Sequence, residues 1–206
     1  MQLIASPLSP FVRKVRVLLI EAGLTDQVEV VNVTTTPLET DAQAAAANPL
    51  GKIPALIREG GATLHDSRVI TRYLDTLAGG GFYPPARLWE VLTLEATAEG
   101  MMDAAVLMTY EGRFRPEDKQ HAPWVEAQWA KIARALDAVE ARWMSHLAGP
   151  SDMSHIAMGC ALDYLDLRQG ARDWRRGRPG LETWHANFAQ RDSMMHTAPT
   201  PAPAPE

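Results

Sequence analysis

The sequence has little of what marks secreted, membrane-spanning or nucleic-acid-binding proteins. Cys160 is its one cysteine, so no disulfide can form within the chain. No apolar run approaches the roughly 18 residues of a membrane-spanning helix, and the N-terminus lacks the charged and apolar regions of a secretion signal. The 20 lysines and arginines form no long run and are outnumbered by 25 acidic residues. We therefore expect a cytoplasmic protein that binds neither nucleic acid nor a membrane.

The sequence does contain enough apolar material for one large domain or two smaller ones, since 46% of its 206 residues are hydrophobic. We expect residues 1–78 to form an α/β domain and residues 87–196 an all-helical domain. The glycine- and proline-rich residues 79–86 are expected to link them. Residues 197–206 form a Pro-rich tail, which we expect to be extended or disordered.

In the first domain, strand and helix patterns alternate. Short apolar or β-branched runs predict strands, and apolar residues three and four apart predict helices. The Gly60-Gly61 pair is a tight-turn signal, so the strands on its two sides are expected to form a hairpin. In chain order we predict a strand at 3–5, a helix from 10 to 22, a strand at 28–33, a helix at 38–47 and strands at 55–58 and 62–64. A further helix, capped by Asp66 or Ser67, is predicted to extend to Leu77.

The second domain follows helical patterns throughout. A long helix is predicted from 87 to about 112, an amphipathic one from 124 to 147, and a last one around Leu181. Residues 154–167 are apolar nearly all round, which is typical of a helix buried on every side. We place this helix at the centre of the domain, where Cys160 is a packed core residue rather than a nucleophile.

One stretch near the N-terminus is arranged to hold an anion. The first strand ends at two Ser-Pro pairs, and a helical pattern begins at once. Ser9 stands at the N-cap and Pro10 at the first helical position, where a missing N–H costs nothing. The first turn of a helix has unpaired N–H groups, which attract negative charge. Ser9 is therefore a structural cap, a group that contacts a bound anion, or both, since one hydroxyl can accept and donate.

Four segments of the sequence carry a resemblance to a known family. They are Ser9-Pro10-Phe11-Val12-Arg13-Lys14, Asn48-Pro49-Leu50-Gly51-Lys52-Ile53-Pro54, Asp66-Ser67 before a helix, and Ala161-Leu162-Asp163-Tyr164-Leu165-Asp166. In this order and at these separations, the segments resemble the cytosolic glutathione transferases, and most of all the bacterial branch with a serine at the active position. The resemblance covers essentially the whole chain. It implies a thioredoxin-like N-terminal domain followed by an all-helical C-terminal domain.

The resemblance also implies glutathione as the co-substrate. In this interpretation Ser9 donates a hydrogen bond to the glutathione sulfur, and Ser6 is the alternative donor. Ile53 pairs with the cysteinyl backbone, as an added strand would, and is followed by a cis Pro54. Lys52 binds the glycyl carboxylate as a point charge, or is simply an exposed loop lysine.

The γ-glutamyl end of glutathione is assigned to a predicted helix start. The Ser67 hydroxyl and the nearby N–H groups suit its carboxylate, while Asp66 suits its ammonium group. Plain helix capping is the alternative role of this pair. A pocket for the second substrate is expected to include five residues that also fit ordinary core packing: Leu8, Phe11, Met101, Met102 and Tyr110.

The proposed chemistry has an energetic requirement. Making a thiol mostly thiolate at pH 7 needs a pKa shift of roughly two units, or about 2.7 kcal/mol. A helix N-terminus supplies about 0.3–1 kcal/mol, and up to about 2 kcal/mol in a partly buried site. A hydroxyl that donates to the sulfur anion supplies about 1.5–3 kcal/mol. Because neither alone is comfortably enough, we expect the helix start and Ser9 to act together.

The start of the buried helix departs from the family pattern. Relatives carry a Ser/Thr-x-x-Asp capping box there, whereas this chain has Asp152 and, three residues later, His155. We expect Asp152 to cap the helix and His155 not to return the reciprocal bond. This start is then less firmly tied and sensitive to pH through His155. Near the C-terminus, Arg191-Asp192-Ser193 replaces the Arg-Pro-Ser of relatives, so the path of the tail is not predicted.

The remaining charged residues and histidines give no site in the sequence. Arg13, Lys14 and Arg16 are expected to form a solvated face of the first helix. The six histidines show no i,i+4 pair and no ligand cluster, so no metal site is expected.

Two classes of function remain. The first is an enzyme, a detoxifying glutathione transferase that acts on a small electrophile or, alternatively, a glutathione-dependent peroxidase or thiol transferase. The second is a protein of the same fold that binds a ligand or partner with little turnover. The intact set of Ser9, Ile53-Pro54 and Asp66-Ser67 favours the enzyme. The resemblance further implies a homodimer.

Overall fold

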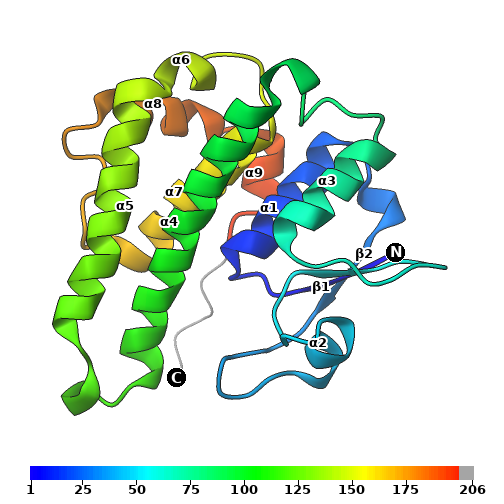
Figure 1. Ribbon diagram of the computed structural model, residues 1–206, viewed down its shortest axis with the longest axis horizontal. Coiled ribbons are helices and arrows are strands. Elements are labelled where there is room, and N and C mark those ends of the chain that lie inside the picture. Colours follow the sequence, from blue (N-terminus) through cyan, green and yellow to red (C-terminus); the bar gives the residue numbers. More distant parts are fainter. Residues whose placement is uncertain (200–206) are drawn as a thin grey trace. The chain divides into compact units, whose positions relative to one another are not determined.

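Two compact units make up the structure (Figure 1). The computed structural model describes residues 1–199, and its contacts group Met1–Pro85 with the residues from Asp192 onward, and Ala86–Arg191 as the second unit. The first unit contains strands and helices and the second is built of helices, which confirms the expected α/β and all-helical halves. The helical domain was expected to extend to residue 196, but residues 192–196 contact the first unit. Residues 200–206 of the expected tail lie outside the described part of the chain.

A three-stranded sheet forms the centre of the first unit, in the order β2-β1-β3. β1 (Gln2–Ala5) pairs in parallel with β2 (Glu29–Asn32) and antiparallel with β3 (Ala55–Ile57). The first three strands of the prediction are therefore confirmed. Leu3, Ile4 and Ala5 are almost completely buried, as expected of a central strand.

The predicted hairpin strand at 62–64 is wrong as a strand. It is reduced to one bridge, in which Leu56 and Leu64 exchange two backbone hydrogen bonds of 2.8 and 2.9 Å. The next pair of that ladder would join Arg58 and Ala62. Instead, the Arg58 guanidinium donates to the Ala62 carbonyl from Nε at 3.1 Å and from Nη2 at 2.9 Å. A side chain has thus taken the acceptor that a longer strand would use.

Helices cover both faces of this sheet (Figure 1). α1 (Pro10–Glu21) and α3 (Ser67–Leu77) pack together on one face, and α2 (Ala42–Ala47) lies on the other. The core under α2 is a cluster of Ile4, Ala44, Ala47 and Ala55. α2 begins later than residue 38 because the Asp41 carboxylate caps it, accepting from Gln43 N–H at 2.8 Å and Ala44 N–H at 3.1 Å.

The prediction that Arg13, Lys14 and Arg16 form a solvated face of the first helix is wrong for Arg13 and Lys14. Arg13 is 4% exposed and Lys14 is 0% exposed. A short helix that the sequence did not predict, α9 (Asp192–His196), packs against α1. Arg13 Nη2 donates to the Met194 carbonyl at 3.1 Å, and Arg13 Nε donates to Thr197 Oγ1 at 3.4 Å. We call these two contacts the C-terminal latch.

The second unit is built around α7 (Met153–Gln169), which packs mainly against α4 (Leu88–Phe114). Every residue from Met153 to Leu162 is buried, including Cys160, so the predicted central helix is confirmed. The predicted helix at 124–147 is divided at Trp143, and the last predicted helix is present. The remaining helices of the unit are α5 (Ala122–Arg142), α6 (Met144–Leu147) and α8 (Pro179–Phe188).

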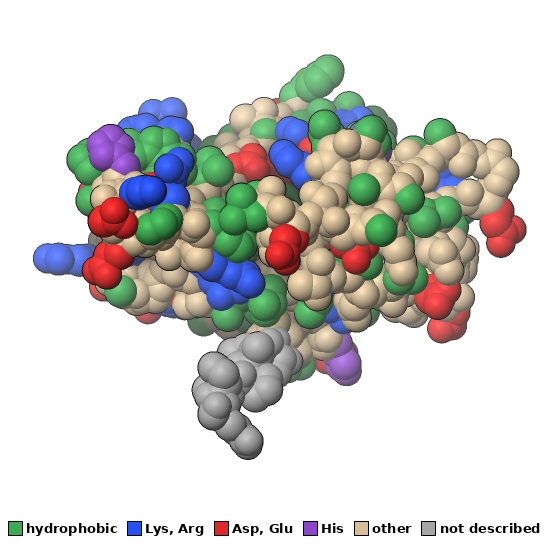
Figure 2. Space-filling model, turned by 90° about the horizontal axis from the view of Figure 1, so that it is seen from below, with side chains coloured by type: hydrophobic (Ala, Val, Ile, Leu, Met, Phe, Trp, Pro, Cys, Tyr) green, Lys and Arg blue, Asp and Glu red, His purple; other side chains and the backbone are tan. Residues whose placement is uncertain are grey.

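The surface carries charges of both signs. On the face seen in Figure 2, acidic and basic side chains are interspersed rather than gathered by sign, in keeping with a formal net charge of −5. Within residues 1–199, no helix has the length and apolar character needed to cross a membrane.

The C-terminal latch gives the first prediction. Arg13→Ala should lower the free energy of unfolding by roughly 2–3 kcal/mol, because it removes two hydrogen bonds that a charged donor makes to buried acceptors. Urea unfolding followed by circular dichroism measures this change. Arg16→Ala, a half-buried arginine of the same helix, is the matched control and should cost less than about 1 kcal/mol. Equal losses of unfolding free energy in Arg13→Ala and Arg16→Ala would contradict a stabilising role for the C-terminal latch.

Candidate functional site

Ser9 lies where the sequence predicts, at the N-cap of α1. Its Oγ accepts a hydrogen bond from the Val12 N–H at 3.3 Å, and Pro10 occupies the first turn. The Ser9 N–H donates to the Ser6 carbonyl at 3.1 Å, which closes the turn after β1. Because Oγ is an acceptor in the cap, the hydroxyl keeps its own proton to donate elsewhere. The cap and a contact with an anion are therefore compatible.

Ile53 and Pro54 immediately precede β3, and the peptide bond between them is cis, as the resemblance implies. Ile53 is half-buried and packs against the α2 cluster. The loop before it is held by Asn48, whose Nδ2 donates to the Lys52 carbonyl at 2.8 Å and whose Oδ1 accepts from the Leu50 N–H at 3.0 Å. The Lys52 side chain is exposed. The backbone at this position is therefore fixed while the lysine charge is accessible.

Asp66 caps α3, and Ser67 is the first residue of that helix. The Asp66 carboxylate accepts from the Arg68 N–H at 2.8 Å, and the Arg68 guanidinium lies 3.2 Å from it. Partial burial raises the pKa of Asp66, but the hydrogen bonds from Arg68 and the charges of Arg68 and Lys14 outweigh it and hold the pKa below its usual value. Ser67 is 3% exposed. Arg68 was not among the predicted site residues, and its guanidinium pairs with the Asp66 carboxylate.

The strand register brings these three segments together. β1 and β3 are antiparallel with Ile4 opposite Ala55, and β3 meets Leu64 at Leu56. Continuing the same register places Pro54 beside Ala5 and level with Asp66. The ends that follow β1, precede β3 and lead into α3 therefore meet at one edge of the sheet. Two helix N-termini, those of α1 and α3, begin at this edge.

The five residues expected to line a second-substrate pocket belong to different units and have different environments. Leu8 and Phe11 flank Ser9 in the first unit and are half-buried. In the helical unit, Met101 and Met102 are each 1% exposed, and the Tyr110 ring contacts the Phe114 ring edge-on at 5.2 Å. Their part in a pocket remains a prediction.

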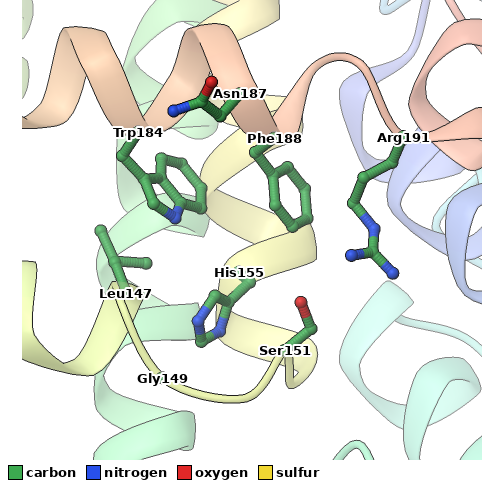
Figure 3. A pocket seen from close by; sticks show the side chains of 8 residues that line it. All are labelled: Leu147, Gly149, Ser151, His155, Trp184, Asn187, Phe188 and Arg191. Carbon is green, nitrogen blue, oxygen red and sulfur yellow. The ribbon is translucent and has the colours of Figure 1, made fainter.

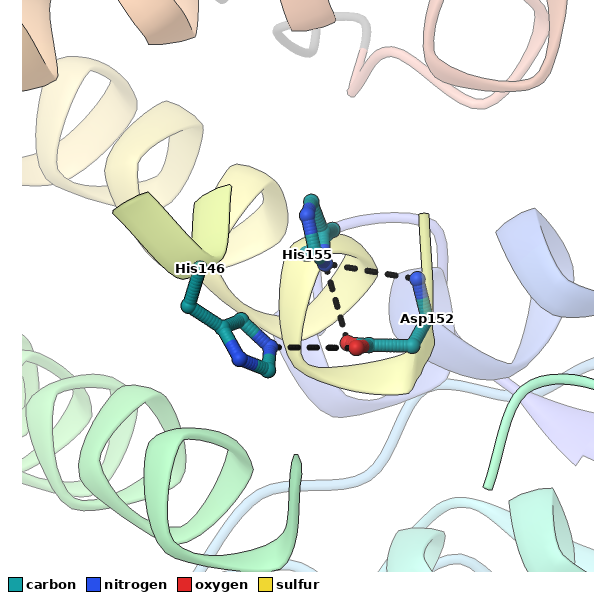
Figure 4. A group of neighbouring side chains, drawn as sticks. All are labelled: His146, Asp152 and His155. Carbon is teal, nitrogen blue, oxygen red and sulfur yellow. Dashed lines mark hydrogen bonds and ion pairs between the residues drawn. The ribbon is translucent and has the colours of Figure 1, made fainter. Parts of the chain in front are cut away.

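The start of α7 is firmly tied, contrary to expectation (Figure 4). The Asp152 carboxylate accepts from the Ser154 N–H at 3.0 Å, and His155 Nδ1 accepts from the Asp152 N–H at 3.3 Å, which completes a capping box. The same nitrogen lies 2.9 Å from Asp152 Oδ1, to which it donates when it carries the ring proton. His146 Nε2 lies 3.0 Å from Asp152 Oδ2, and Arg87 Nη2 lies 3.6 Å from the same oxygen. One buried carboxylate therefore joins the end of α6 to the start of α7.

Folding also brings histidines and carboxylates together in two groups that sequence spacing did not show. Among the described residues, His146, Asp152 and His155 have ligand-type atoms within 4.8 Å of one another, as do Asp163, Asp166 and His185. In the second group, His185 Nε2 lies 2.6 Å from Asp163 Oδ1, and Asp166 accepts from Trp174 Nε1 at 2.8 Å. In the second group these atoms are engaged in hydrogen bonds and ion pairs within the protein. In the first, Asp152 Oδ2 has only the ion pairs with His146 and Arg87, and His155 Nε2 has no hydrogen-bond partner among the described residues.

Two members of the first group, Asp152 and His146, have pKa values below their usual ones. Burial by itself raises the pKa of Asp152, but the hydrogen bonds from His155 and Ser154 and the charges of the two histidines hold that pKa below its usual value. Burial, together with the charges of His155 and Arg87, lowers the pKa of His146, although the Asp152 carboxylate opposes this. The folded state therefore favours an ionised Asp152 beside a neutral His146.

Known proteins share this architecture. Residues 8–77 match the family model of the glutathione S-transferase N-terminal domain, and residues 122–187 match that of the C-terminal domain. The chain is 34% identical over 207 residues to the "Uncharacterized GST-like protein YibF" of Escherichia coli (strain K12), across 98% of this chain and all of that protein.

Two solved structures of a glutathione transferase family member from Pseudomonas fluorescens Pf-5 are similar as well. The structure with bound glutathione is 42% identical with a TM-score of 0.94, covering 97% of this chain and 98% of the other. The structure with bound S-(propanoic acid)-glutathione is 41% identical with a TM-score of 0.90, covering 97% and 100%. The fold is thus a thioredoxin-like domain followed by an all-helical one, as the sequence predicts. The chain belongs to the glutathione S-transferase family.

The α7 start gives a prediction about pH. The folded-state pKa of His146 lies below the value of about 6.5 that it has in an unfolded chain, so the unfolded state binds more protons at mildly acidic pH. Stability from this group is present above about pH 6.5 and is lost as the pH falls through the range below it. Wild type should therefore show a lower thermal midpoint at pH 5.5 than at pH 7.5, measured by calorimetry.

His146→Gln should reduce that difference, because glutamine keeps a polar side chain beside Asp152 and does not titrate. His121→Gln, a change at an exposed histidine, should leave the difference as in wild type. The lowered pKa of Asp152 removes stability only below about pH 4, outside the compared range. An unchanged difference in His146→Gln would exclude His146 as the source.

Proposed function

We propose that this protein is a glutathione transferase that binds glutathione at the sheet edge formed by Ser9, Ile53-Pro54 and Asp66-Ser67. The observation that carries the proposal is the strand register, which aligns these segments although they lie far apart in the sequence. Glutathione is the co-substrate, in agreement with its presence in the structure of a relative that is 42% identical. The sulfur would lie at Ser9, at the start of α1.

Each segment suits one part of the tripeptide. The backbone of Ile53 would pair with the cysteinyl unit, and the exposed Lys52 ammonium would attract the glycyl carboxylate. At the start of α3, Asp66 would accept from the γ-glutamyl ammonium group, while the Ser67 hydroxyl and the helix N–H groups would face the adjacent carboxylate. The ammonium group of the ligand would thus contact the Asp66 carboxylate, and the ligand carboxylate would contact the N-terminus of α3 beside it.

Ser9 would favour the thiolate over the thiol. Its Oγ already accepts from the Val12 N–H, so its proton can be donated to the sulfur. The thiolate then attacks an electrophilic carbon of the second substrate. A carbon–sulfur bond forms, and either the bond to a leaving group breaks, or the electron pair of an activated double bond moves to the neighbouring carbon and takes up a proton.

Conjugation is the reaction best supported. A relative that is 41% identical has been crystallised with S-(propanoic acid)-glutathione, a glutathione whose sulfur carries a carbon substituent, as a conjugation product does. Peroxide reduction and thiol transfer would instead pass through an oxidised sulfur or a disulfide. We therefore propose a small electrophile as the second substrate, a detoxifying role and, from the family resemblance, a homodimer.

Binding without turnover is the competing proposal, and retention on immobilised glutathione followed by an assay distinguishes the two. We expect retention, and conjugation of both 1-chloro-2,4-dinitrobenzene and acrylate. Retention without conjugation of any electrophile would favour the binding protein. No retention at millimolar glutathione would reject the glutathione site itself.

Ser9→Ala tests the role of the hydroxyl. It should lower kcat by about 10- to 100-fold, because a hydrogen bond to a charged sulfur contributes roughly 1.5–3 kcal/mol. The KM for glutathione should change much less, since the remaining contacts are kept. Ser6→Ala is the matched control and should retain activity. A larger loss in Ser6→Ala would transfer the role to Ser6, and equal losses in kcat and glutathione affinity for Ser9→Ala would leave Ser9 a structural cap.

Asp66→Asn tests recognition of the γ-glutamyl end. The amide keeps the size of the side chain and can still cap α3, but it loses the charge that faces an ammonium group. The KM for glutathione should rise by about tenfold with little change in kcat, in steady-state kinetics. Asp41→Asn, the same change at the cap of α2, should leave the KM unaltered. A KM for Asp66→Asn within about twofold of wild type would reject this assignment.

A further inference from the structure

A pocket of about 240 Å³ lies within the helical unit, between α6, the start of α7 and α8 (Figure 3). None of the residues assigned to glutathione lines it. Trp184 and Phe188 belong to α8, and their rings lie near the ring of His155 at the start of α7. Leu147, from the end of α6, contributes a further apolar side chain. The pocket is therefore formed by parts of three helices of one unit.

His155 brings an unsatisfied polar atom to this pocket. Its side chain is 1% exposed, and its Nε2 is buried with no hydrogen-bond partner among the described residues. A buried polar atom without a partner is costly, so most have one. The other ring nitrogen, Nδ1, is already engaged with Asp152. Nε2 is therefore the nitrogen that a molecule in the pocket can satisfy.

The contacts of Nδ1 determine which kind of partner Nε2 needs. Nδ1 lies 2.9 Å from Asp152 Oδ1, and an ionised carboxylate only accepts, so Nδ1 carries the ring proton when it donates to Asp152. Nε2 of the neutral ring is then an acceptor. In the other tautomer, Nδ1 accepts from the Asp152 N–H 3.3 Å away, and Nε2 carries the proton. A hydroxyl group satisfies Nε2 in both tautomers, because it donates and accepts.

The charges around the pocket favour an uncharged ligand. None of the described residues that line it is acidic, so a cation has no opposite charge there. The Asp152 carboxylate beside it is engaged with Ser154 and His146. Arg191 lines the pocket, but its Cζ lies 5.5 Å from the centroid of the Phe188 ring and it has further interactions within the protein. An anion would place its charge against the Nε2 lone pair, which is unfavourable.

Flat apolar surfaces line the same pocket. The Trp184 and Phe188 rings are stacked with centroids 4.9 Å apart and an angle of 19° between their planes. The His155 ring lies 6.2 Å from the Trp184 ring and 6.4 Å from the Phe188 ring, and Leu147 is 3% exposed. Such walls suit a planar ring. The volume is below the roughly 300–1,000 Å³ of drug-sized sites, which limits the occupant to about one ring.

We propose that this pocket binds a small uncharged phenol, at a site separate from the residues assigned to glutathione. The phenol ring would pack against Trp184, Phe188 and Leu147, and its O–H would donate to His155 Nε2. With a pKa near about 10, as in tyrosine, such a phenol is uncharged at pH 7. By accepting from Nδ1, the Asp152 carboxylate polarises the imidazole and makes Nε2 a stronger acceptor.

Phenol is the probe that tests this site. It would be titrated into the full-length protein with S-hexylglutathione in excess, which occupies the proposed glutathione site and the space beside the sulfur. Nitrogen NMR of the labelled histidines would be recorded, and the His155 signals are identified by their absence in His155→Gln. We expect the Nε2 signal to move saturably, with a Kd in the millimolar range.

A matched compound isolates the hydroxyl. Fluorobenzene has the same ring and nearly the same size as phenol but no O–H. It should bind about 3- to 10-fold more weakly than phenol, the factor expected for one net hydrogen bond.

Variants locate the binding, measured for each by calorimetry with phenol. Trp184→Leu should weaken phenol by about 3- to 10-fold, because it removes one aromatic wall. Trp124→Leu changes another half-buried tryptophan of the same unit, outside the pocket, and should alter the affinity by less than about twofold. His155→Gln should also weaken phenol by about 3- to 10-fold. It should keep the fold, because glutamine is a standard residue at this place in a capping box.

Three results would overturn the proposal. The first is a His155 Nε2 signal that does not move at about 20 mM phenol. The second is a fluorobenzene affinity within about twofold of that of phenol. The third is an equal loss of affinity in Trp184→Leu and Trp124→Leu. None of these results bears on glutathione transfer, because the test measures neither glutathione binding nor turnover.

Discussion

The antiparallel pairing of β1 with β3 is the constraint on which the first unit depends. It fixes the register in which Ile4 faces Ala55, and that register alone decides what meets beyond the strand ends. A slip of one residue would exchange the side chains that β1 presents to the two helical layers. It would also separate the turn at Ser9 from the peptide at Ile53-Pro54. The same backbone hydrogen bonds therefore fix the packing of the core and the alignment of the segments to which we assign glutathione.

What could be predicted from the sequence rested on local signals. Ser9 and Asp66 are caps that follow apolar runs and precede helical patterns, and both are caps in the structure. The all-round apolar character of residues 154–167 was enough to place α7 in the centre of the helical unit. The order of strands and helices followed from the same kind of pattern. Each of these features depends on neighbours within a few residues, which is the range over which a single sequence is informative.

The features that could not be predicted depend on hydrogen bonds made by side chains, some of them to residues distant in the sequence. Arg13 is indistinguishable in pattern from a solvated arginine, and its burial follows from a carbonyl 181 residues away. Arg58 ends a strand by bonding a carbonyl that the backbone would otherwise use. His155 replaces a carboxylate in a capping box because a neutral imidazole nitrogen is also an acceptor. The spacing of apolar residues, from which helices and strands are predicted, does not indicate any of these hydrogen-bond partners.

The C-terminal latch makes the first unit discontinuous in sequence, and this has a consequence for how the protein is made. Synthesis is directional, so β1, α1 and the rest of residues 1–85 are complete well before α9 leaves the ribosome. Until then the Arg13 guanidinium lacks the carbonyl that fixes it. The nascent N-terminal unit therefore waits, incompletely closed, for α9. Closure of the first unit follows the synthesis of the helical unit, so a product truncated before α9 lacks a finished first unit.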